Sequence, residues 1–363
     1  MSTRILIMAG GTGGHVFPAL AVARELTARG CEIRWLGTRS GMEADLVARA
    51  GFPLEFISIA GLRGKGLLGW IAAPGRLLRA LWQALRIQRR FRPHAVVGFG
   101  GFVTGPGGVA ARVLGIPLLI HEQNAIAGLT NRLLARVAER VMEAFPRTFR
   151  RATHTGNPVR PEIAALPEPG TRYAEHAGPI RVFVVGGSLG AMALNQTVPQ
   201  ALAQIDAAQR PVVRHQTGQK NLEAAREQYR KANVAAELLP FVDDMAAAYA
   251  WADLVLCRAG ALTVSELAAA GVPAVMVPFP HAVDDHQTHN AHFLVTGQAG
   301  MLVAQENLTP ANLAELLREF CTEPSEGRRR LLAMAEAARR LARPEATRQV
   351  ADLCLAAAMG NQE

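Results

Sequence analysis

Residues 4–18 read RILIMAGGTGGHVFP, an apolar run that passes into a glycine-rich turn and then into a segment of helical character. Residues 180–191, IRVFVVGGSLGA, repeat this order further along the chain. A buried strand, a glycine turn and a helix open a doubly wound α/β sheet. Because this unit occurs twice in 363 residues, a length that accommodates two cores, the sequence predicts two Rossmann-like domains with parallel sheets.

Short apolar runs separated by helical segments continue on both sides of a proline-rich stretch, Pro158 to Pro179. This alternation is typical of βαβ units. We place the linker in the proline-rich stretch and expect a first domain over residues 1–160 and a second over residues 161–363. The last helix of the second domain is a candidate to pack back on the first. Doubly wound sheets bind ligands at the carboxyl ends of their strands, so we expect the domains to face a shared cleft.

The composition is typical of a globular chain. Half of the residues are hydrophobic and 19% are charged, which excludes a disordered chain. No window of about 18 uninterrupted apolar residues occurs, so we expect no membrane-spanning helix. The four cysteines lie far apart and form no CxxC pair, which disfavours a disulfide framework or a zinc knuckle and fits a reducing compartment.

Positive charge is concentrated in the first half of the chain. The formal net charge is +9, and no Asp or Glu occurs between Glu55 and Glu122. An excess of this size favours an anionic partner, which is nucleic acid, acidic lipid or a phosphorylated substrate. The same interval contains these basic residues: Arg63, Lys65, Arg76, Arg79, Arg86, Arg89, Arg90, Arg92 and Arg112.

Both glycine turns are candidate phosphate sites, because the amides and the dipole at a helix start hold anions. The competing interpretation is a tight turn that needs glycine for its dihedral angles. Neither turn has the full G-x-G-x-x-G spacing, and the second strand of each half does not end in an acid that would hold a ribose, which disfavours a nicotinamide dehydrogenase. Gly64-Lys65-Gly66 lacks the Ser or Thr of a P-loop, which disfavours an NTPase.

Two polar motifs each have two interpretations. Residues 261–266, ALTVSE, open a helix, and Glu266 has two oxygens to accept hydrogen bonds from the hydroxyls of a ribose. Thr263 and Glu266 also satisfy the capping-box pattern. Residues 121–124, HEQN, end a strand, so we expect their polar side chains to surface where the cleft opens, with loop capping as the alternative.

Several histidines after residue 280 raise the question of a metal site. His286, His289 and His292 are spaced by three residues, and His281, Asp284 and Asp285 precede them. Residues spaced by three do not stay on one face of a helix, and the H-E-x-x-H pattern is missing. We therefore expect a hydrogen-bonding loop and helix start without a metal.

Residues 61–91 are candidates for contact with a membrane surface. The helix predicted from Arg76 to Phe91 has an apolar stripe flanked by arginines, which also suits a helix packed on the sheet. The loop before it, GLRGKGLLGW at residues 61–70, mixes Leu, Trp and cations without acids, as surfaces that meet anionic lipid do. Each basic residue near such a surface contributes about 1 kcal/mol, so several together support reversible attachment. The stripe comprises Leu77, Leu78, Leu81, Trp82 and Leu85.

Taken together, these motifs resemble those of the N-acetylglucosaminyltransferases of glycosyltransferase family 28, which act in peptidoglycan synthesis. The resemblance implies an α/β fold of the GT-B type, with two Rossmann-like domains that face a cleft. It rests on separated motifs in a fixed order: GGTGGHVFP at 10–18, GLRGKG at 61–66, GGFVTGPGG at 100–108, HEQN at 121–124, GLTN at 128–131, GNPVR at 156–160, GGSLG at 186–190, FVDDM at 241–245 and RAGALTVSE at 258–266.

The resemblance implies that UDP-N-acetylglucosamine (UDP-GlcNAc) binds mainly to the second domain. It implies Phe241 and Val242 at the uracil and Glu266 on the ribose. The residues implied at the diphosphate are Ser188 and the turn Ala261, Leu262, Thr263, Val264 and Ser265. Arg160 and Gln287 complete the implied donor site, which Thr12, Gly13, Gly14 and Asn124 reach from the first domain.

The implied reaction is a single inverting displacement. The C4 hydroxyl of MurNAc in undecaprenyl-diphosphate-MurNAc-pentapeptide (lipid I) attacks the donor, and lipid II forms. His15, just past the first glycine turn, is the candidate general base. No cofactor is implied, and no metal, since no D-x-D motif is present to bridge phosphates through a cation. The implied location is peripheral, at the cytoplasmic face of the bacterial inner membrane. The implied partners are UDP-GlcNAc, lipid I, anionic phospholipid and other cell-wall and division proteins, without nucleic acid.

Two alternatives remain open at this point. A UDP-GlcNAc epimerase of the same fold would need no lipid acceptor. A non-catalytic protein that binds nucleotides or nucleic acid would explain the positive charge, but it would leave the paired glycine turns without a purpose.

Overall fold

The structure is a computed structural model that describes residues 2–59, 73–187 and 189–360. It contains two compact units, the first made of residues 1–159 and 343–363 and the second of residues 160–342. The last helix, α16 (Ala346–Gly360), packs on α1 (Gly13–Ala28) and belongs to the first unit, whereas the boundary expected from sequence put residues 343–363 in the second domain. The loop at residues 61–70, with Arg63 and Lys65, lies outside the described residues, as does Ser188.

The first unit is built on a seven-stranded parallel sheet in the order β3-β2-β1-β4-β5-β6-β7. Successive side chains of a strand point to opposite faces, and in β1 Ile5 and Ile7 face one layer of helices while Leu6 and Met8 face the other. Burial on both faces explains the near-continuous apolar run. The strands are β1 (Arg4–Ala9), β2 (Glu32–Gly37), β3 (Leu54–Phe56), β4 (Ala95–Gly100), β5 (Leu118–Glu122), β6 (Arg140–Glu143) and β7 (Thr153–His154).

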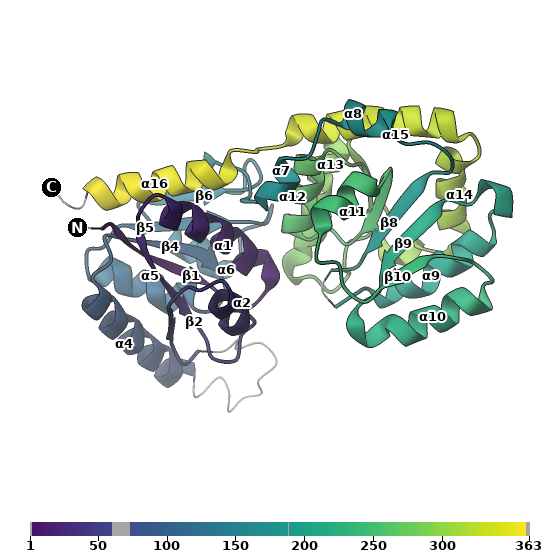
Figure 1. Cartoon of the computed structure of the whole chain (residues 1–363). Coiled ribbons are helices and arrows are strands. Elements are labelled where there is room, and N and C mark those ends of the chain that lie inside the picture. The colour runs from purple at the N-terminus through teal and green to yellow at the C-terminus, as the bar shows by residue number, and fades with distance from the viewer. Residues whose placement is uncertain (1, 60–72, 188, 361–363) are drawn as a thin grey trace. The chain divides into compact units, whose positions relative to one another are not determined.

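Helices cover both faces of this sheet (Figure 1). One layer consists of α1, α2 (Glu43–Arg49) and α16. The other consists of α4 (Ala73–Phe91), α5 (Thr104–Val113) and α6 (Leu129–Leu134).

The second unit contains a six-stranded parallel sheet in the order β10-β9-β8-β11-β12-β13. Two doubly wound parallel sheets are the fold class that the sequence predicts, and the prediction is confirmed. The strands are β8 (Arg181–Val185), β9 (Val212–Gln216), β10 (Glu237–Leu239), β11 (Leu254–Cys257), β12 (Ala274–Met276) and β13 (Gly300–Leu302). The helices are α7 (Pro161–Ala164), α8 (Pro169–Ala174), α9 (Met192–Ala203), α10 (Leu222–Lys231), α11 (Met245–Trp251), α12 (Ala261–Ala270), α13 (His286–Thr296), α14 (Pro310–Cys321) and α15 (Pro324–Leu341).

The proline-rich stretch, in which the sequence places the linker, contains the boundary between the two units at residues 159 and 160. It contains α7 and α8, and both belong to the second unit. The buried guanidinium of Arg172 in α8 donates hydrogen bonds to the carbonyl oxygens of Tyr249, Ala270 and Gly271. These carbonyls lie at helix ends, where backbone acceptors lack helical partners, so Arg172 ties the stretch into the unit.

Helix α4 packs only part of its leucine stripe on the sheet: Leu81 and Leu85 are partly buried against the core, as expected for a helix packed on the sheet. Its buried face consists of small and branched residues, among them Ala80, Ala84 and Ile87. Leu78 is 67% exposed and Trp82 is 59% exposed. The packing interpretation is therefore wrong for these side chains. Within the described residues, no helix has the length and apolar character needed to cross a bilayer.

Candidate active site

The first glycine turn, residues 10–14, joins β1 to α1. Gly11 has a φ of +91°, in the region that favours glycine. Thr12 is extended just before the helix, and its carbonyl accepts from the amides of His15 at 3.1 Å and Val16 at 3.2 Å. The turn thus places Gly13 and Gly14 at the carboxyl end of β1, the edge at which such sheets bind ligands.

The imidazole of His15 is held by the backbone of the same turn. Its Nδ1 lies 3.2 Å from the carbonyl oxygen of Gly10 and 3.4 Å from Oγ1 of Thr12. A carbonyl oxygen only accepts, so the contact with Gly10 requires the proton on Nδ1. The neutral ring then carries its lone pair on Nε2, and a general base at this position would act through that nitrogen.

A carboxylate that the sequence did not single out closes the first glycine turn. Glu43 opens α2 and is fully buried, and its Oε2 accepts a hydrogen bond from the amide of Gly11 at 3.1 Å. One amide that a bound phosphate would use is therefore already paired with an anion of the protein. The first turn therefore offers a phosphate one amide fewer than its sequence suggests.

The HEQN motif supports a loop and does not surface as expected. His121, Glu122 and Gln123 are all buried, and only Asn124 remains partly exposed. The carboxylate of Glu122 accepts from the amide and the side chain of Asn124, from the amide of Gly128 and from the side chain of Asn131, at distances of 2.9–3.2 Å. The loop-capping interpretation therefore holds for Glu122.

His121 is a neutral residue of the core. Its Nε2 donates to the carbonyl of Gly156 at 2.9 Å, and its Nδ1 accepts from Gln123 at 3.0 Å. Burial lowers the pKa of His121 to about 4, against a smaller opposing effect of the Gly156 hydrogen bond. The ring is therefore uncharged at neutral pH and positions the end of β5.

In the second unit, the residue implied for the ribose is already organised. Glu266 is 3% exposed, and its Oε1 accepts from Nε of Arg160 at 2.9 Å and from Nη2 at 2.8 Å. The hydroxyl of Tyr249 donates to Oε2 at 3.3 Å. Burial raises the pKa of the Glu266 carboxyl, while the charge and hydrogen bonds of Arg160 and the hydrogen bond of Tyr249 act against it.

These contacts decide between the two interpretations of ALTVSE. Helix α12 begins at Ala261, and its N-cap residue is Gly260, without a side-chain cap. Glu266 turns toward Arg160 and Tyr249 instead of the backbone at the helix start. The capping-box interpretation is therefore wrong, and Glu266 is a buried carboxylate with a fixed orientation.

The second glycine turn, residues 186–190, is held by close backbone packing. Gly190 has a φ of +74°, and a Cβ at this position would collide with the carbonyl of Thr217. The side-chain amide of Asn195 donates to that carbonyl at 3.0 Å, and that of Asn221 donates to the carbonyl of Leu189 at 3.1 Å. Two neutral side-chain amides thus bind the carbonyls of Thr217 and Leu189. Among the described residues, no carboxylate takes part in holding this turn.

The other implied donor residues lie at the carboxyl edge of the second sheet or just beyond it. In α12, Ala261 and Val264 have buried side chains, so a ligand would meet their backbone, whereas Leu262, Thr263 and Ser265 are partly exposed. Val242 is partly exposed, and Phe241 beside it is exposed. Gln287 in α13 accepts from the amide of Phe279 at 2.9 Å, so this contact orients its side chain.

No metal centre is formed by the residues that the structure describes. Among them, no group of three His, Cys, Asp or Glu side chains is arranged to hold an ion. His286, His289 and His292 of α13 belong to no such group.

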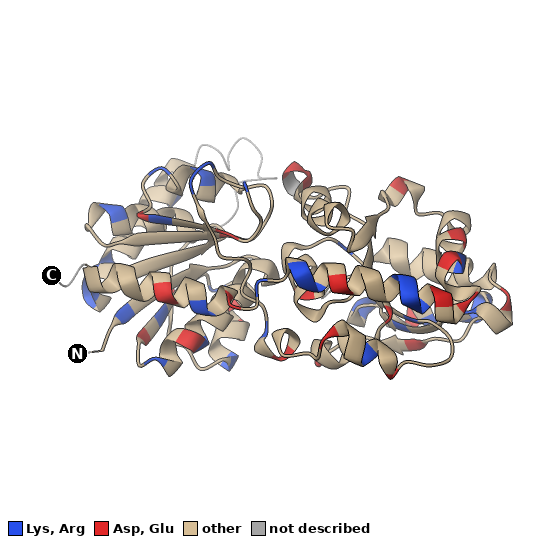
Figure 2. Ribbon diagram, turned by 90° about the horizontal axis from the view of Figure 1, so that it is seen from above, with Lys and Arg blue, Asp and Glu red and all other residues tan. Residues whose placement is uncertain are grey.

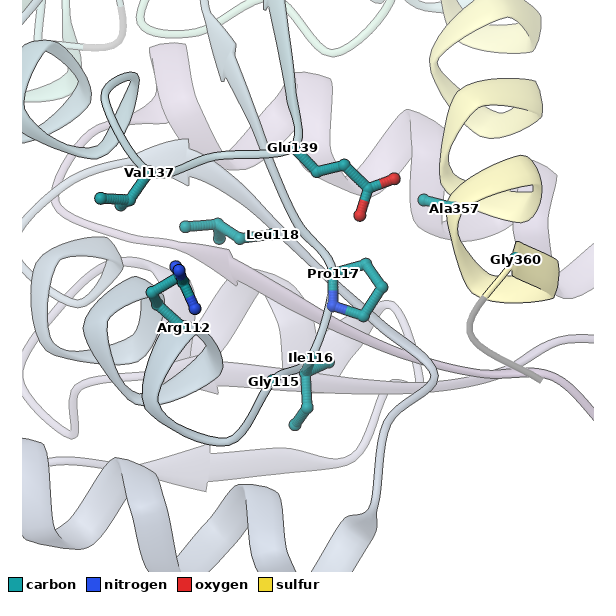
Figure 3. A pocket seen from close by; sticks show the side chains of 9 residues that line it. All are labelled: Arg112, Gly115, Ile116, Pro117, Leu118, Val137, Glu139, Ala357 and Gly360. Carbon is teal, nitrogen blue, oxygen red and sulfur yellow. The ribbon is translucent and has the colours of Figure 1, made fainter. Parts of the chain in front are cut away.

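One pocket lies away from all of these residues. It is formed at the amino end of β5, with Arg112 and Glu139 among its lining side chains together with Pro117 and Leu118 (Figure 3). Doubly wound sheets bind their substrates at the opposite edge, so we do not assign the donor to this pocket.

The structure groups the predicted residues in two sets. Thr12, Gly13, Gly14 and His15 share one turn of the first unit, and Asn124 follows β5 at the same edge of that sheet. Arg160 and Glu266 are in direct contact in the second unit. The union of the two sets in one site stays a prediction. Sequence reasoning missed Glu43 and Tyr249, because their partners lie 32 and 17 residues away and no local pattern marks them.

Two doubly wound units, each opened by a glycine turn at its ligand-binding edge, are typical of GT-B glycosyltransferases. Comparison with known proteins leads to the family. The model of the glycosyltransferase family 28 N-terminal domain matches residues 5–143, and that of the C-terminal domain matches residues 181–350. The chain belongs to glycosyltransferase family 28.

Similar proteins cover nearly the whole chain. A protein of Marinobacter nauticus is 59% identical over 98% of this chain and 98% of its own, and one of Ralstonia nicotianae is 57% identical over 98% and 96%. Both are named UDP-N-acetylglucosamine–N-acetylmuramyl-(pentapeptide) pyrophosphoryl-undecaprenol N-acetylglucosamine transferase. The crystal structure of Acinetobacter baumannii MurG is 46% identical, with a TM-score of 0.85, and covers 98% of this chain and 99% of its own.

Proposed function

We propose that this enzyme transfers N-acetylglucosamine from UDP-GlcNAc to the C4 hydroxyl of MurNAc in lipid I and so forms lipid II for peptidoglycan synthesis. The observation that carries the proposal is the 59% identity to a relative of that name over 98% of both chains, because it covers both units. The orientation of Glu266 by Arg160 and Tyr249 agrees with it, since a fixed carboxylate suits the two hydroxyls of a ribose.

The donor is assigned to the second unit. Its ribose lies at Glu266 and its uracil beside Phe241 and Val242. The diphosphate is held by the amides at the start of α12 and by Ser188. These amides and the helix dipole stabilise the charge that develops on the leaving group, without a cation between the phosphates. Arg160 and Gln287 complete the donor site, and Thr12, Gly13, Gly14 and Asn124 approach from the first unit.

The chemical step is one displacement at the anomeric carbon. Nε2 of His15 removes the proton of the C4 hydroxyl as its oxygen forms the new bond to C1. The bond from C1 to the phosphate oxygen breaks, and UDP leaves with the electron pair. Attack opposite to the leaving group inverts the anomeric configuration. The hydrogen bond from Nδ1 of His15 to the carbonyl of Gly10 supports this role, because it leaves Nε2 as the basic nitrogen on the side of the ring away from that carbonyl.

We also propose attachment to the cytoplasmic face of the inner membrane, which the surface of the first unit supports. By sequence, this unit has 23 Lys and Arg against 11 Asp and Glu, a formal charge of +12, whereas the second has 16 against 19, a charge of −3 (Figure 2). Leu77, Leu78 and Trp82 of α4 are exposed beside the exposed Arg79 and Arg86. Apolar side chains among cations suit anionic phospholipid.

A transfer assay tests the proposed reaction. Purified enzyme is incubated with UDP-GlcNAc labelled in the sugar, with and without lipid I. We expect label in the lipid product only when lipid I is present, and no isomerised nucleotide sugar in its absence. Isomerisation without acceptor would favour the epimerase, and tighter binding to nucleic acid than to UDP-GlcNAc would favour a binding protein. Contacts with other cell-wall and division proteins stay a prediction.

A further inference from the structure

A buried carboxylate lies where the first glycine turn would otherwise meet an anionic ligand. Glu43 has no exposed surface, and three glycines make room for its side chain. A Cβ on Gly10 would lie 2.8 Å from its Oε1, and one on Gly37 would lie 3.0 Å from its Cγ. A Cβ on Gly41 would collide with Oε2. The glycines around this position therefore serve the close approach of an acid from within the protein.

Glu43 is fully hydrogen-bonded as an anion. Besides the Gly11 amide, the amide of Thr38 donates to Oε1 at 2.9 Å and the Thr38 hydroxyl donates to it at 2.7 Å. Burial by itself raises the pKa of Glu43, but the hydrogen bonds from Thr38 and Gly11 outweigh burial and hold the pKa below its usual value. A buried charge persists only with such partners, and here they join the first glycine turn to the end of β2.

One peptide unit links Glu43 to His15. The amide of Gly11 donates to Glu43, and the carbonyl of Gly10, on the same peptide bond, lies 3.2 Å from Nδ1 of His15. An anion on the N–H side of a peptide strengthens its carbonyl as an acceptor, because hydrogen bonds in a chain polarise one another. On its other side the ring lies against Gly100, which leaves room for it, since a Cβ there would lie 2.9 Å from its Cδ2.

We propose that Glu43 is a positioning residue of the transferase. It takes the place of a bound anion at the first glycine turn and, through the Gly10–Gly11 peptide, holds the imidazole of His15 with its proton on Nδ1. The inference rests on the proposed function, in which His15 receives the proton of the acceptor hydroxyl. It assigns the first glycine turn to the orientation of the base and leaves the donor diphosphate to the second unit.

Chemical rescue tests this role in the full-length enzyme. We expect Glu43→Ala to lower kcat for GlcNAc transfer to lipid I by about 100-fold, the scale of a misplaced catalytic group, while KM for UDP-GlcNAc changes by less than about 2-fold. Formate or acetate should enter the vacated space and restore at least a tenth of the lost activity. Sodium chloride at the same ionic strength should not.

Three further variants make the result specific. Glu43→Gln keeps the side-chain volume, so no carboxylate can enter, and its activity should fall without rescue by formate. If Glu43→Ala does not fold, the kcat of Glu43→Gln tests the role instead. Glu55→Ala removes a carboxylate of the same unit that pairs with Arg34 and Arg90, and it should retain activity. His15→Ala should not respond to formate.

The outcomes separate the inference from the function on which it rests. Wild-type kcat in either Glu43 variant, or a loss in Glu43→Ala that carboxylates do not relieve, would overturn the role of Glu43. An inactive wild-type enzyme in the presence of lipid I and UDP-GlcNAc would instead refute the proposed function. Circular dichroism and thermal melting of each variant confirm that the rates compare folded proteins.

Discussion

The two glycine turns have similar sequences and are fixed in opposite ways. In the first, the amide of Gly11 is bound by the buried carboxylate of Glu43. In the second, neutral side-chain amides of Asn195 and Asn221 donate to nearby carbonyls, and no carboxylate accepts from the described amides of the turn. A glycine-rich turn therefore shows that something approaches the backbone closely, and the surrounding fold decides whether that is a ligand or the protein itself.

The difference suggests a division of labour between the units. A turn already filled by an internal anion is rigid and suits the orientation of a catalytic group. In the second turn the amide of Gly190 donates to the carbonyl of Gly187 at 2.8 Å, and no internal anion takes up the described amides. Such a turn is suited to receive the negative charge of a substrate, as helix starts commonly are. The following experiments challenge or refine this contrast.

The largest effect is expected at the first turn, in His15→Ala. Removal of a general base lowers rates by about 10² to 10⁴, so kcat should fall within that range. KM for UDP-GlcNAc should stay near its wild-type value, because the donor is assigned to the second unit. Steady-state transfer to lipid I measures both constants. Nearly full turnover would remove His15 as the base.

At the second turn, Gly190→Ala should weaken donor binding and stability, with Gly187→Ala as the matched control. Both residues have positive φ, +74° and +88°, but only at Gly190 would a Cβ meet the backbone of Thr217. Positive φ costs an alanine about 1 kcal/mol, so Gly187→Ala should lose about that much. Gly190→Ala should lose about 3 kcal/mol or more and raise KM for UDP-GlcNAc at least about 10-fold. If both variants lost the same stability in thermal unfolding and showed the same KM, close packing of Gly190 on Thr217 would not be the cause.

Acid should destabilise both units through one buried histidine in each. Burial lowers the pKa of His121 to about 4 and that of His215 to about 3. Unfolded histidine titrates near 6.5, so the unfolded chain binds more protons below that pH, and stability falls as pH drops toward the folded values. At pH 5 each histidine should cost about 2 kcal/mol relative to neutral pH.

Leucine variants of the two histidines isolate this effect. His121→Leu and His215→Leu should have a lower free energy of unfolding than wild type at pH 7.5. In urea unfolding at pH 5, the difference in unfolding free energy between each variant and wild type should be smaller by about 2 kcal/mol. For Val213→Ala, in the same strand as His215, the difference in unfolding free energy from wild type should be equal at both pH values. A difference that does not become smaller for the histidine variants would mean that these rings are not buried in neutral form.

A smaller effect is expected on the surface of α4. Leu78→Ser should reduce binding to vesicles of anionic phospholipid about 10-fold, because insertion of a leucine contributes about 1.5 kcal/mol. Val212→Ser removes an apolar side chain that is also exposed but belongs to the second unit, and it should leave binding unchanged. Equal loss in both variants would argue against membrane contact through the first unit.

No effect is expected from a chelator. If backbone amides stabilise the leaving diphosphate, activity should persist in EDTA. Transfer to lipid I with and without EDTA, followed by addition of Mg²⁺, measures this directly. Loss of activity that Mg²⁺ restores would show that a cation shares the task assigned to Ser188 and the start of α12.

Local sequence patterns identified most of the architecture. The apolar runs, the glycine turns and the start of α12 predicted two parallel sheets and their ligand-binding edges, because each of these signals is written within a few neighbouring residues. The motif order indicated the family, and family models that match both units confirm it. The placement of His15 and Glu266 at those edges followed from the same patterns.

Tertiary structure decided what each polar residue does. Glu43 reaches a turn 32 residues earlier in the chain, and Arg160 reaches Glu266 across 106 residues. His121, Glu122 and Gln123 are buried instead of exposed. Leu77 and Leu78 of α4 are exposed, since small residues such as Ala80 and Ala84 already fill the interface between α4 and the sheet. Burial and hydrogen-bond pairing depend on neighbours brought together by folding, whereas period and composition report only on neighbours along the chain.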